Sequence, residues 1–301
     1  MRIGKRRTSN DDVIDRRGAS PAGGVGRGMG LPIGVGGGGI GIVVVVLFLL
    51  VQVCSSSGGG GGFGDIFSQF PSSNLSPQGE QGIPPGADPD ADMVEFLEFV
   101  TGDVNDNWEE YFAQSNQEYP RVPLVLFEGT TNTACGLGSE ATGPFYCPAD
   151  QMAYLDIDFF DQLHQQFGAP GDFAAAYVVA HEAGHHIQTL TGIGNNVRQE
   201  SQANPDDANE LSVRQELQAD CFAGVWGYSA KQRGLLEEGD LEEALTAAAA
   251  IGDDRIQESA GQDVNPETWT HGSGEQRVKW FRRGFDTGDP NQCDTFSVDE
   301  P

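Results

Sequence analysis

Positively charged side chains are scarce in this sequence. It has 17 Lys and Arg residues against 45 Asp and Glu residues, which gives a formal net charge of −28. Seven of the basic residues fall within residues 1–31, so the remaining 270 residues carry ten basic and 42 acidic side chains. Such an acidic surface repels nucleic acid and anionic lipid headgroups, so charge-driven binding to either is disfavoured. The acidity favours solubility instead.

Cysteine is also infrequent, and the five cysteines contain no C-x-x-C pair. This absence disfavours the alternative of a zinc site built from thiolates. Four cysteines lie in the acidic part of the chain, and an even number there is typical of an oxidising compartment. The sequence therefore predicts two disulfides, Cys135–Cys147 and Cys221–Cys293, the second of which would strap the C-terminal segment onto a helix.

Long apolar runs are confined to residues 31–53, which include no charged side chain. These residues are long enough to span a bilayer as a helix, although several glycines weaken it. The basic flank precedes the run, so the positive-inside rule predicts a cytoplasmic tail at residues 1–30 and an extracytoplasmic domain. A cleaved signal peptide is the alternative, but no small-x-small site ends the run. Residues 54–92 have the composition of a disordered linker, which leaves residues 93–301 for the folded domain.

Side chains that can bind a metal or transfer a proton are concentrated in the segment His181-Glu182-Ala183-Gly184-His185. Residues 173–190 favour a helix, so His181 and His185, four apart, leave the same face and can share one metal ion. Glu182 lies between them and is placed to take a proton from a water at the metal, as in the H-E-x-x-H pattern. The alternative is a buried helix whose histidines bind main-chain carbonyls.

A second helix, predicted over residues 209–224, carries Glu216 and Asp220, again four apart. Catalytic zinc needs a third protein ligand and an open position for water. The spacing lets Glu216 reach the metal, while Asp220 accepts the outer N–H of a ligand histidine and fixes its tautomer. Together the two helices predict one Zn²⁺ ion held by His181, His185 and Glu216.

These residues resemble known families of zinc peptidases. Glu-x-x-x-Asp after His-Glu-x-x-His looks like the glutamate-liganded gluzincins, which include thermolysin-like enzymes and membrane CAAX-protease relatives. The chain is more closely similar to the neutral zinc metallopeptidase family of bacterial membrane-anchored proteins, in residues 143–150, 181–186, 214–224 and 270–273.

The CAAX-protease relatives carry a similar His followed six residues later by Arg. Their resemblance to this chain implies that His271 donates a hydrogen bond to the developing oxyanion and that Arg277 steadies the Glu216 region. The alternative is that His271 serves only the start of the last helix.

The predicted fold is α+β, a mainly helical zincin-like domain with a small antiparallel sheet, preceded by a transmembrane helix and a linker. Strands are predicted over residues 122–127, 135–147 and 152–158. In the zinc peptidases that the chain resembles, an edge strand before the motif helix pairs with extended substrate, which implies this role for residues 142–145. An ordinary stabilising hairpin is the alternative.

The predicted function is that of a membrane-anchored, extracytoplasmic zinc peptidase acting on peptide or protein substrates, with Glu182 as general base. Because the ligand imidazoles must be neutral, activity is expected to fall as the pH drops through about 6. Two alternatives keep the same residues: a non-catalytic, zinc-stabilised binding or scaffold protein, and a metallohydrolase acting on non-peptide amides. Glu182 discriminates against the first, because zinc storage needs no such carboxylate.

Overall fold

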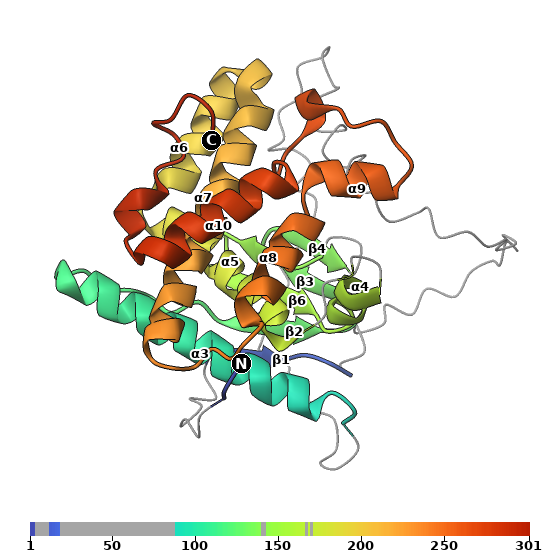
Figure 1. Cartoon of the computed structure of the whole chain (residues 1–301), viewed down its shortest axis with the longest axis vertical. Helices are drawn as coiled ribbons and strands as arrows, with labels where there is room; N and C mark the ends of the chain where they lie inside the picture. Colours follow the sequence, from blue (N-terminus) through green and yellow to red (C-terminus); the bar gives the residue numbers. More distant parts are fainter. Residues whose placement is uncertain (4–11, 19–87, 140–142, 166–167, 169–170) are drawn as a thin grey trace, which may run out of the picture.

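The computed structural model describes residues 1–3, 12–18, 88–139, 143–165, 168 and 171–301. Within these residues the fold is α+β, as predicted (Figure 1). Eight α-helices are present in the described part: α3 (Ala91–Gln114), α4 (Phe159–Gln165), α5 (Asp172–Leu190), α6 (Ile193–Ala203), α7 (Ala208–Gln232), α8 (Asp240–Ala250), α9 (Asp253–Ser259) and α10 (Gly274–Thr287).

The main sheet has the strand order β1-β2-β6-β5, built from β1 (Val13–Asp15), β2 (Leu124–Phe127), β6 (Met152–Asp156) and β5 (Phe145–Cys147). The pairs β1–β2 and β2–β6 are parallel, and only β5 runs antiparallel to β6. The prediction of an antiparallel sheet is therefore wrong here. All four residues of β2 are buried, and a strand covered on both faces is typical of parallel pairing. A separate antiparallel hairpin joins β3 (Thr130–Thr133) to β4 (Gly136–Ser139).

The N-terminal segment belongs to this same folded unit. Strand β1 pairs with β2 in the register Val13 to Leu124, and the buried guanidinium of Arg17 lies 2.8 Å from the Asp15 carboxylate and 2.7 Å from that of Asp88. Residues 17 and 88 flank the long intervening segment, so both of its ends meet at one ion-pair cluster. A tail on the far side of a membrane could not make these contacts with the domain.

The prediction of a single-pass membrane protein is therefore wrong. Across the described residues, no helix is both long enough and apolar enough to cross a bilayer. The run predicted to span the membrane, residues 31–53, lies outside the described residues. The positive-inside argument also fails on the tail, since strand β1 and Arg17 are packed into the domain.

Helix α5 is the element around which the others are arranged. It packs against α7, α8 and α3 and also contacts β5 and β6. Figure 1 shows the strands and α4 on one side of the molecule and α6, α7 and α10 on the other. The start of α5 follows Gly171, whose φ of 114° favours glycine, and Glu243 of α8 accepts the main-chain N–H of Phe173.

Glycines allow the helices that carry the site to approach closely. A Cβ on Gly184 of α5 would lie 2.9 Å from Cα of Ala219 on α7. A Cβ on Gly284 of α10 would lie 1.9 Å from the carbonyl oxygen of Cys221, also on α7. Because no larger side chain fits at these crossings, α7 is held tightly against both neighbours.

Both predicted disulfides are confirmed. Cys135–Cys147 joins the turn of the β3–β4 hairpin to the end of β5. Cys221–Cys293 joins α7 to the short 3₁₀ helix η4 (Pro290–Cys293). The second bridge therefore straps the C-terminal segment onto the helix that carries Glu216, as the sequence analysis expected.

Candidate metal centre

Three side chains from two helices converge on one point. Nε2 of His181 lies 3.2 Å from Oε2 of Glu216, and Nε2 of His185 lies 3.4 Å from Oε1 of the same carboxylate. The two imidazole rings stand perpendicular, with centroids 4.8 Å apart. One ligand-type atom from each residue falls within 4.8 Å of the others. The structure thus brings together the three residues that the sequence analysis selected as ligands.

The spacing of these atoms fits a zinc ion. Tetrahedral zinc with ligand bonds of about 2.0–2.2 Å places neighbouring ligand atoms about 3.3–3.6 Å apart. Of the observed separations, 3.4 Å falls within this range and 3.2 Å lies just below it, and each histidine nitrogen faces a different oxygen of Glu216. Two imidazole nitrogens and one carboxylate oxygen are also ligands that zinc commonly takes. The donor set and its geometry are therefore suited to the metal without rearrangement of the helices.

Asp220 holds the first histidine. Its Oδ1 lies 2.9 Å from Nδ1 of His181 and accepts a hydrogen bond from the hydroxyl of Tyr177. Arg277 donates from its Nε to Oδ2 of Asp220 over 2.9 Å, and from its terminal NH2 group to Oδ1 over 3.0 Å. Since Asp220 is fully buried and acts as acceptor, Nδ1 of His181 carries a proton and Nε2 faces Glu216.

Arg277 is buried on α10, which packs against the helix that carries Glu216. Its side chain contacts Asp220, the Tyr177 hydroxyl, Nδ1 of His181 and the carbonyl oxygen of Ile251, and the role beside Glu216 that the family resemblance implies stays a prediction. The guanidinium is only 2% exposed. Arg277 therefore acts on the site through Asp220 and His181.

Gln188 holds the second histidine. Its side-chain oxygen Oε1 lies 2.9 Å from Nδ1 of His185. Its amide nitrogen donates to the main-chain oxygen of Gln215 and to the side-chain oxygen of Gln218. With Nδ1 engaged in this way, Nε2 of His185 is directed at Glu216.

Opposite charges stabilise one another in the metal-free cluster. Burial opposes protonation of His181, but the carboxylates of Asp220 and Glu216 outweigh it and raise the pKa of His181 to about 10. Burial would raise the pKa of Glu216, yet the charges of His185 and His181 lower this pKa well below its usual value. A proton therefore occupies the cluster at neutral pH until a cation displaces it.

Glu182 is buried beside this cluster, with 6% of its surface exposed. Burial raises the pKa of Glu182 above its ordinary value, against the opposing charges of His181 and His185. A carboxylate with a raised pKa is a better proton acceptor than an exposed one.

His271 lies in the loop before α10 and is fixed by Asp253 at the start of α9. Its Nδ1 lies 3.1 Å from Oδ1 of Asp253, while Oδ2 accepts the main-chain N–H groups of Thr270, His271 and Gly272. The charge of His271 contributes to the low pKa of Glu216. The last helix begins with a capping box of Ser273 and Gln276.

The sequence did not indicate three residues of this site, Tyr177, Gln188 and Asp253. Tyr177 precedes His181 by four residues and Gln188 follows His185 by three, so helical spacing on α5 could have indicated both. Asp253 has no partner at helical spacing that would have indicated it. It lies 18 positions before His271, and no sequence period links the two.

Strand β5 is the edge of the main sheet and contacts α5. Tyr146 of β5 has its hydroxyl 3.0 Å from Nδ1 of His186, whose Nε2 lies 2.6 Å from the carbonyl oxygen of Pro120. His186 is fully buried and points away from the metal cluster. It therefore serves packing and strand attachment, in agreement with its position on the helix.

A second acidic group on the molecule has a different occupant. Carboxylate oxygens of Asp172, Asp240 and Glu243 lie within 4.8 Å of one another. The ammonium group of Met1 lies 2.8 Å from Asp172 and 3.3 Å from Asp240. This ammonium group balances the charge of the carboxylates. The cluster also differs from the one at His181 and His185 because it contains no histidine.

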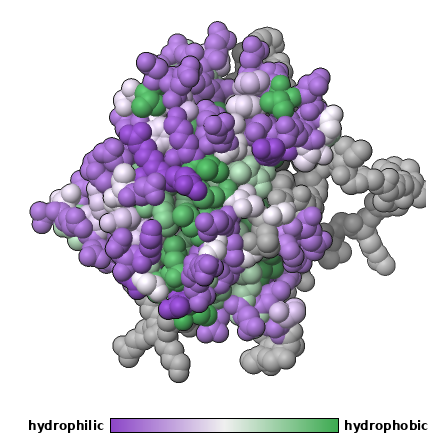
Figure 2. Space-filling view, in the orientation of Figure 1, coloured by the Kyte–Doolittle hydropathy of each residue, from purple (hydrophilic) through white to green (hydrophobic). Residues whose placement is uncertain are grey.

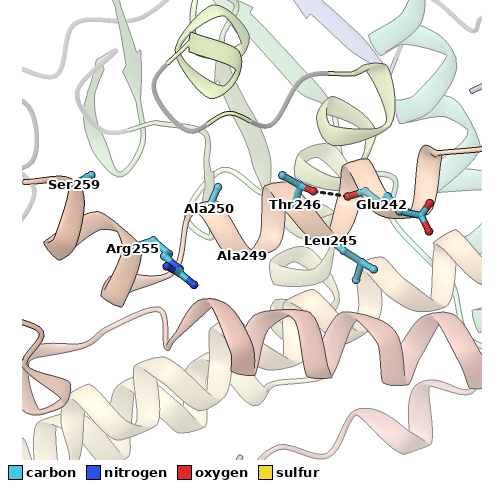
Figure 3. A pocket seen from close by; sticks show the side chains of 7 residues that line it. All are labelled: Glu242, Leu245, Thr246, Ala249, Ala250, Arg255 and Ser259. Carbon is cyan, nitrogen blue, oxygen red and sulfur yellow. Dashed lines mark hydrogen bonds between the residues drawn. The ribbon is translucent and has the colours of Figure 1, made fainter.

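A shallow pocket lies along α8 and α9, away from the residues described above. Figure 3 shows Glu242 towards one end and Arg255 with Ser259 towards the other, with Leu245, Thr246, Ala249 and Ala250 between them. Figure 2 shows hydrophobic residues gathered across the middle of an otherwise hydrophilic face, over α8 and α10. None of the metal-ligand candidates lines this pocket, so acid–base chemistry is concentrated at the histidine cluster instead.

Two histidines and one glutamate that converge in this way are ligand types of a zinc centre. The chain belongs to the family described as "Putative neutral zinc metallopeptidase", which matches residues 1–296. The resemblance seen in the sequence motifs is thereby confirmed at the family level. No solved structure matches the chain.

Curated relatives are similar to this chain over more than half of its length. Over 220 residues the chain is 50% identical to "Uncharacterized protein YpfJ" of Escherichia coli (strain K12), and this alignment covers 73% of the chain and 76% of the relative. Over 191 residues it is 52% identical to "Uncharacterized protein Rv2575" of Mycobacterium tuberculosis (strain H37Rv), with 60% of the chain and 64% of the relative covered.

Proposed function

We propose that this protein is a zinc-dependent peptidase in which His181, His185 and Glu216 bind the metal and Glu182 is the general base. The observation that carries the proposal is the convergence of the two Nε2 atoms on the Glu216 carboxylate at 3.2 and 3.4 Å, with Glu182 buried beside them. Bound zinc supplies a Lewis acid that polarises the scissile carbonyl and lowers the pKa of water from 15.7 toward about 7.

Glu182 moves the proton in this mechanism. Its carboxylate accepts a proton from the attacking water and then donates it to the amine that leaves. Burial supports both steps, because it raises the pKa of Glu182 and makes the proton easier to accept. Asp220 and Gln188 keep the outer nitrogens of the two histidines occupied, so the inner nitrogens stay available.

His271 stabilises the charge that develops on the carbonyl oxygen. Desolvation opposes its protonation, but the hydrogen bond that its ring donates to Asp253 and the charge of Glu216 raise its pKa above the usual value. The side chain keeps 38% of its surface exposed, so its ring can meet a bound substrate. A protonated ring donates a hydrogen bond to an oxyanion more strongly than a neutral one.

Extended substrate would pair with the edge strand β5. One side of β5 is occupied by β6 and the other is the border of the main sheet. Strand addition uses main-chain hydrogen bonds and therefore suits peptides of varied sequence. Contact of β5 with α5 supports this position for the scissile bond relative to the histidines.

The decisive experiment is the substitution Glu182→Gln in the full chain. We expect cleavage of a broad peptide library to fall by roughly 10²–10⁴-fold while zinc stoichiometry stays unchanged, because only the proton acceptor is lost. Glu200→Gln on the exposed surface of α6 is the matched control and should cleave like the wild type. Equal cleavage by Glu182→Gln and wild type would remove Glu182 from the mechanism.

The non-catalytic alternative makes the opposite prediction for the wild type. If the protein with stoichiometric zinc cleaves no member of a peptide library, the metal serves the fold or a binding function only. If it cleaves cell-wall amide fragments but no peptide, the alternative of a non-peptide metallohydrolase replaces the proposal.

A further inference from the structure

Gln188 has only one orientation compatible with its surroundings. Its amide nitrogen lies 2.7 Å from the main-chain oxygen of Gln215 and 3.1 Å from the side-chain oxygen of Gln218, both of which accept hydrogen bonds. Turning the amide over would place oxygen against oxygen at both contacts. The side-chain oxygen of Gln188 must therefore face Nδ1 of His185, which carries a proton for this contact.

Gln218 is fixed in the same way from its other end. Its amide nitrogen donates over 3.0 Å to the main-chain oxygen of Cys293, so its side-chain oxygen faces Gln188. Gln188 is fully buried, Gln218 is 4% exposed and Cys293 is 1% exposed. Each amide is thus oriented by its neighbour in a place that water does not reach.

These hydrogen bonds lead from His185 to Cys293, and Cys293 is held covalently. Cys293 is bonded to Cys221 of α7, three residues after Gln218 on the same helix. Gln218 and Cys221 therefore both contact the η4 segment, one through a hydrogen bond and the other through the disulfide. The carbonyl oxygen of Cys293 is placed for Gln218 because this bridge fixes the main chain there.

We propose that Gln188 and Gln218 form a hydrogen-bond relay that positions the metal ligand His185, and that the Cys221–Cys293 disulfide anchors its outer end. The relay connects His185 with Cys293, 108 positions away in the chain. Its role rests on the proposed metal site but not on peptide cleavage. Gln188 and Gln218 are positioning residues, because they act on the metal only through His185.

The two ligand histidines are consequently held by different chemistry. His181 donates to the charged carboxylate of Asp220, which Arg277 and Tyr177 also contact. His185 donates to a neutral amide, whose strength as an acceptor depends on the groups that polarise it. Loss of the outer end of the relay should therefore weaken His185 as a ligand and leave His181 unaffected.

The test measures zinc affinity of the full chain by competition with a chromophoric chelator. Gln188→Leu should weaken zinc binding by roughly 10–100-fold, the usual effect of removing the partner of a ligand histidine. Gln218→Leu and the pair Cys221→Ala with Cys293→Ala should weaken it in the same direction by a smaller factor. Thermal unfolding of each zinc-free variant verifies that it is folded.

Two matched controls isolate the relay. Removing the other disulfide by Cys135→Ala with Cys147→Ala should leave zinc affinity within about twofold, since this bridge lies on the hairpin. Gln232→Ala, at the exposed end of the same helix α7, should also leave it unchanged.

A double-mutant cycle gives the sharpest outcome. Once Gln188 is replaced by leucine, removal of Cys221–Cys293 should cause little further loss of zinc affinity, because the bridge has no amide left to orient. If the two changes weaken zinc binding independently, so that their factors multiply in the combined variant, the relay is overturned. An unchanged zinc affinity in Gln188→Leu would overturn it as well. A wild type that binds zinc but cleaves no peptide would contradict the proposed function and leave this test intact.

Discussion

Asp253 lies 3.1 Å from His271 through Oδ1 and Nδ1, while its second carboxylate oxygen accepts three consecutive main-chain N–H groups of the loop that carries this histidine. The carboxylate thereby fixes both the ring and the backbone beneath it. Neighbouring Asp254 instead accepts the N–H of Gly274 at the start of α10. The two aspartates at the start of α9 thus have separate roles.

Replacing Asp253 by alanine should lower kcat for peptide cleavage without changing zinc affinity. His271 would lose its orientation and its raised pKa, so the alkaline limb of the pH–rate profile should move to lower pH. The loss should be smaller than the roughly 10²–10³-fold expected for His271→Ala. Asp254→Ala is the control and should alter stability more than kcat. An unshifted alkaline limb in Asp253→Ala would separate Asp253 from the chemistry.

Zinc binding should release protons and tighten as the pH rises. The pKa of His181 in the metal-free protein is raised to about 10, so the ring is protonated below that value and must lose the proton to bind zinc. One displaced proton makes the apparent affinity about tenfold tighter per pH unit between roughly 7 and 9. Calorimetry in two buffers of different ionisation enthalpy measures the protons released. A pH-independent affinity would contradict this account.

The same raised pKa has the opposite effect on the metal-free fold. A histidine whose pKa is higher in the folded state adds stability that is complete below its unfolded value of 6.5 and is lost as the pH rises toward about 10. Metal-free protein should therefore unfold at lower urea concentration as the pH rises through this window. Zinc should reverse the trend, because it binds more tightly at high pH.

Gly284→Ala should destabilise the protein strongly. The new Cβ would lie 1.9 Å from the oxygen of Cys221 and 2.8 Å from the nitrogen of Val225, both main-chain atoms of α7. The helices would have to separate, at a cost of about 1–3 kcal/mol or more. In the control Gly194→Ala on α6, the new Cβ would come no nearer than 3.9 Å to a neighbouring atom. Urea unfolding of this variant should show no loss of stability or a gain of up to about 1 kcal/mol. Equal effects at the two glycines would contradict the close crossing.

Arg277→Met should leave a buried carboxylate without its ion pair. Arg277 is 2% exposed and Asp220 is fully buried, so the substitution should cost about 3–5 kcal/mol of unfolding free energy. Zinc affinity should fall as well, since Asp220 would no longer be fixed against His181. Arg282→Met, exposed on the same helix, should change stability by no more than about 0.5 kcal/mol. Similar stability of the two variants would show that Asp220 is held by other groups.

The sequence by itself determined the features that depend on neighbouring residues. Helix α5 begins one residue before the predicted 173–190, and the capping box at Ser273 and Gln276 forms as its spacing predicts. His181 and His185 face one direction because four residues make about one helical turn. Glu216 and Asp220 share a face of α7 for the same reason.

The tertiary structure alone decided how these local units meet. Pairing of β1 with β2, the ion pair between Arg17 and Asp88 and the Asp253–His271 contact join segments separated by 18 to more than 100 positions, and no local period specifies them. The apolar run at residues 31–53 predicted a membrane anchor from composition, but composition does not record that Arg17 and Asp88 meet in one domain. Helical periodicity fixes the direction of side chains on one element, whereas packing of distant surfaces fixes which elements face each other.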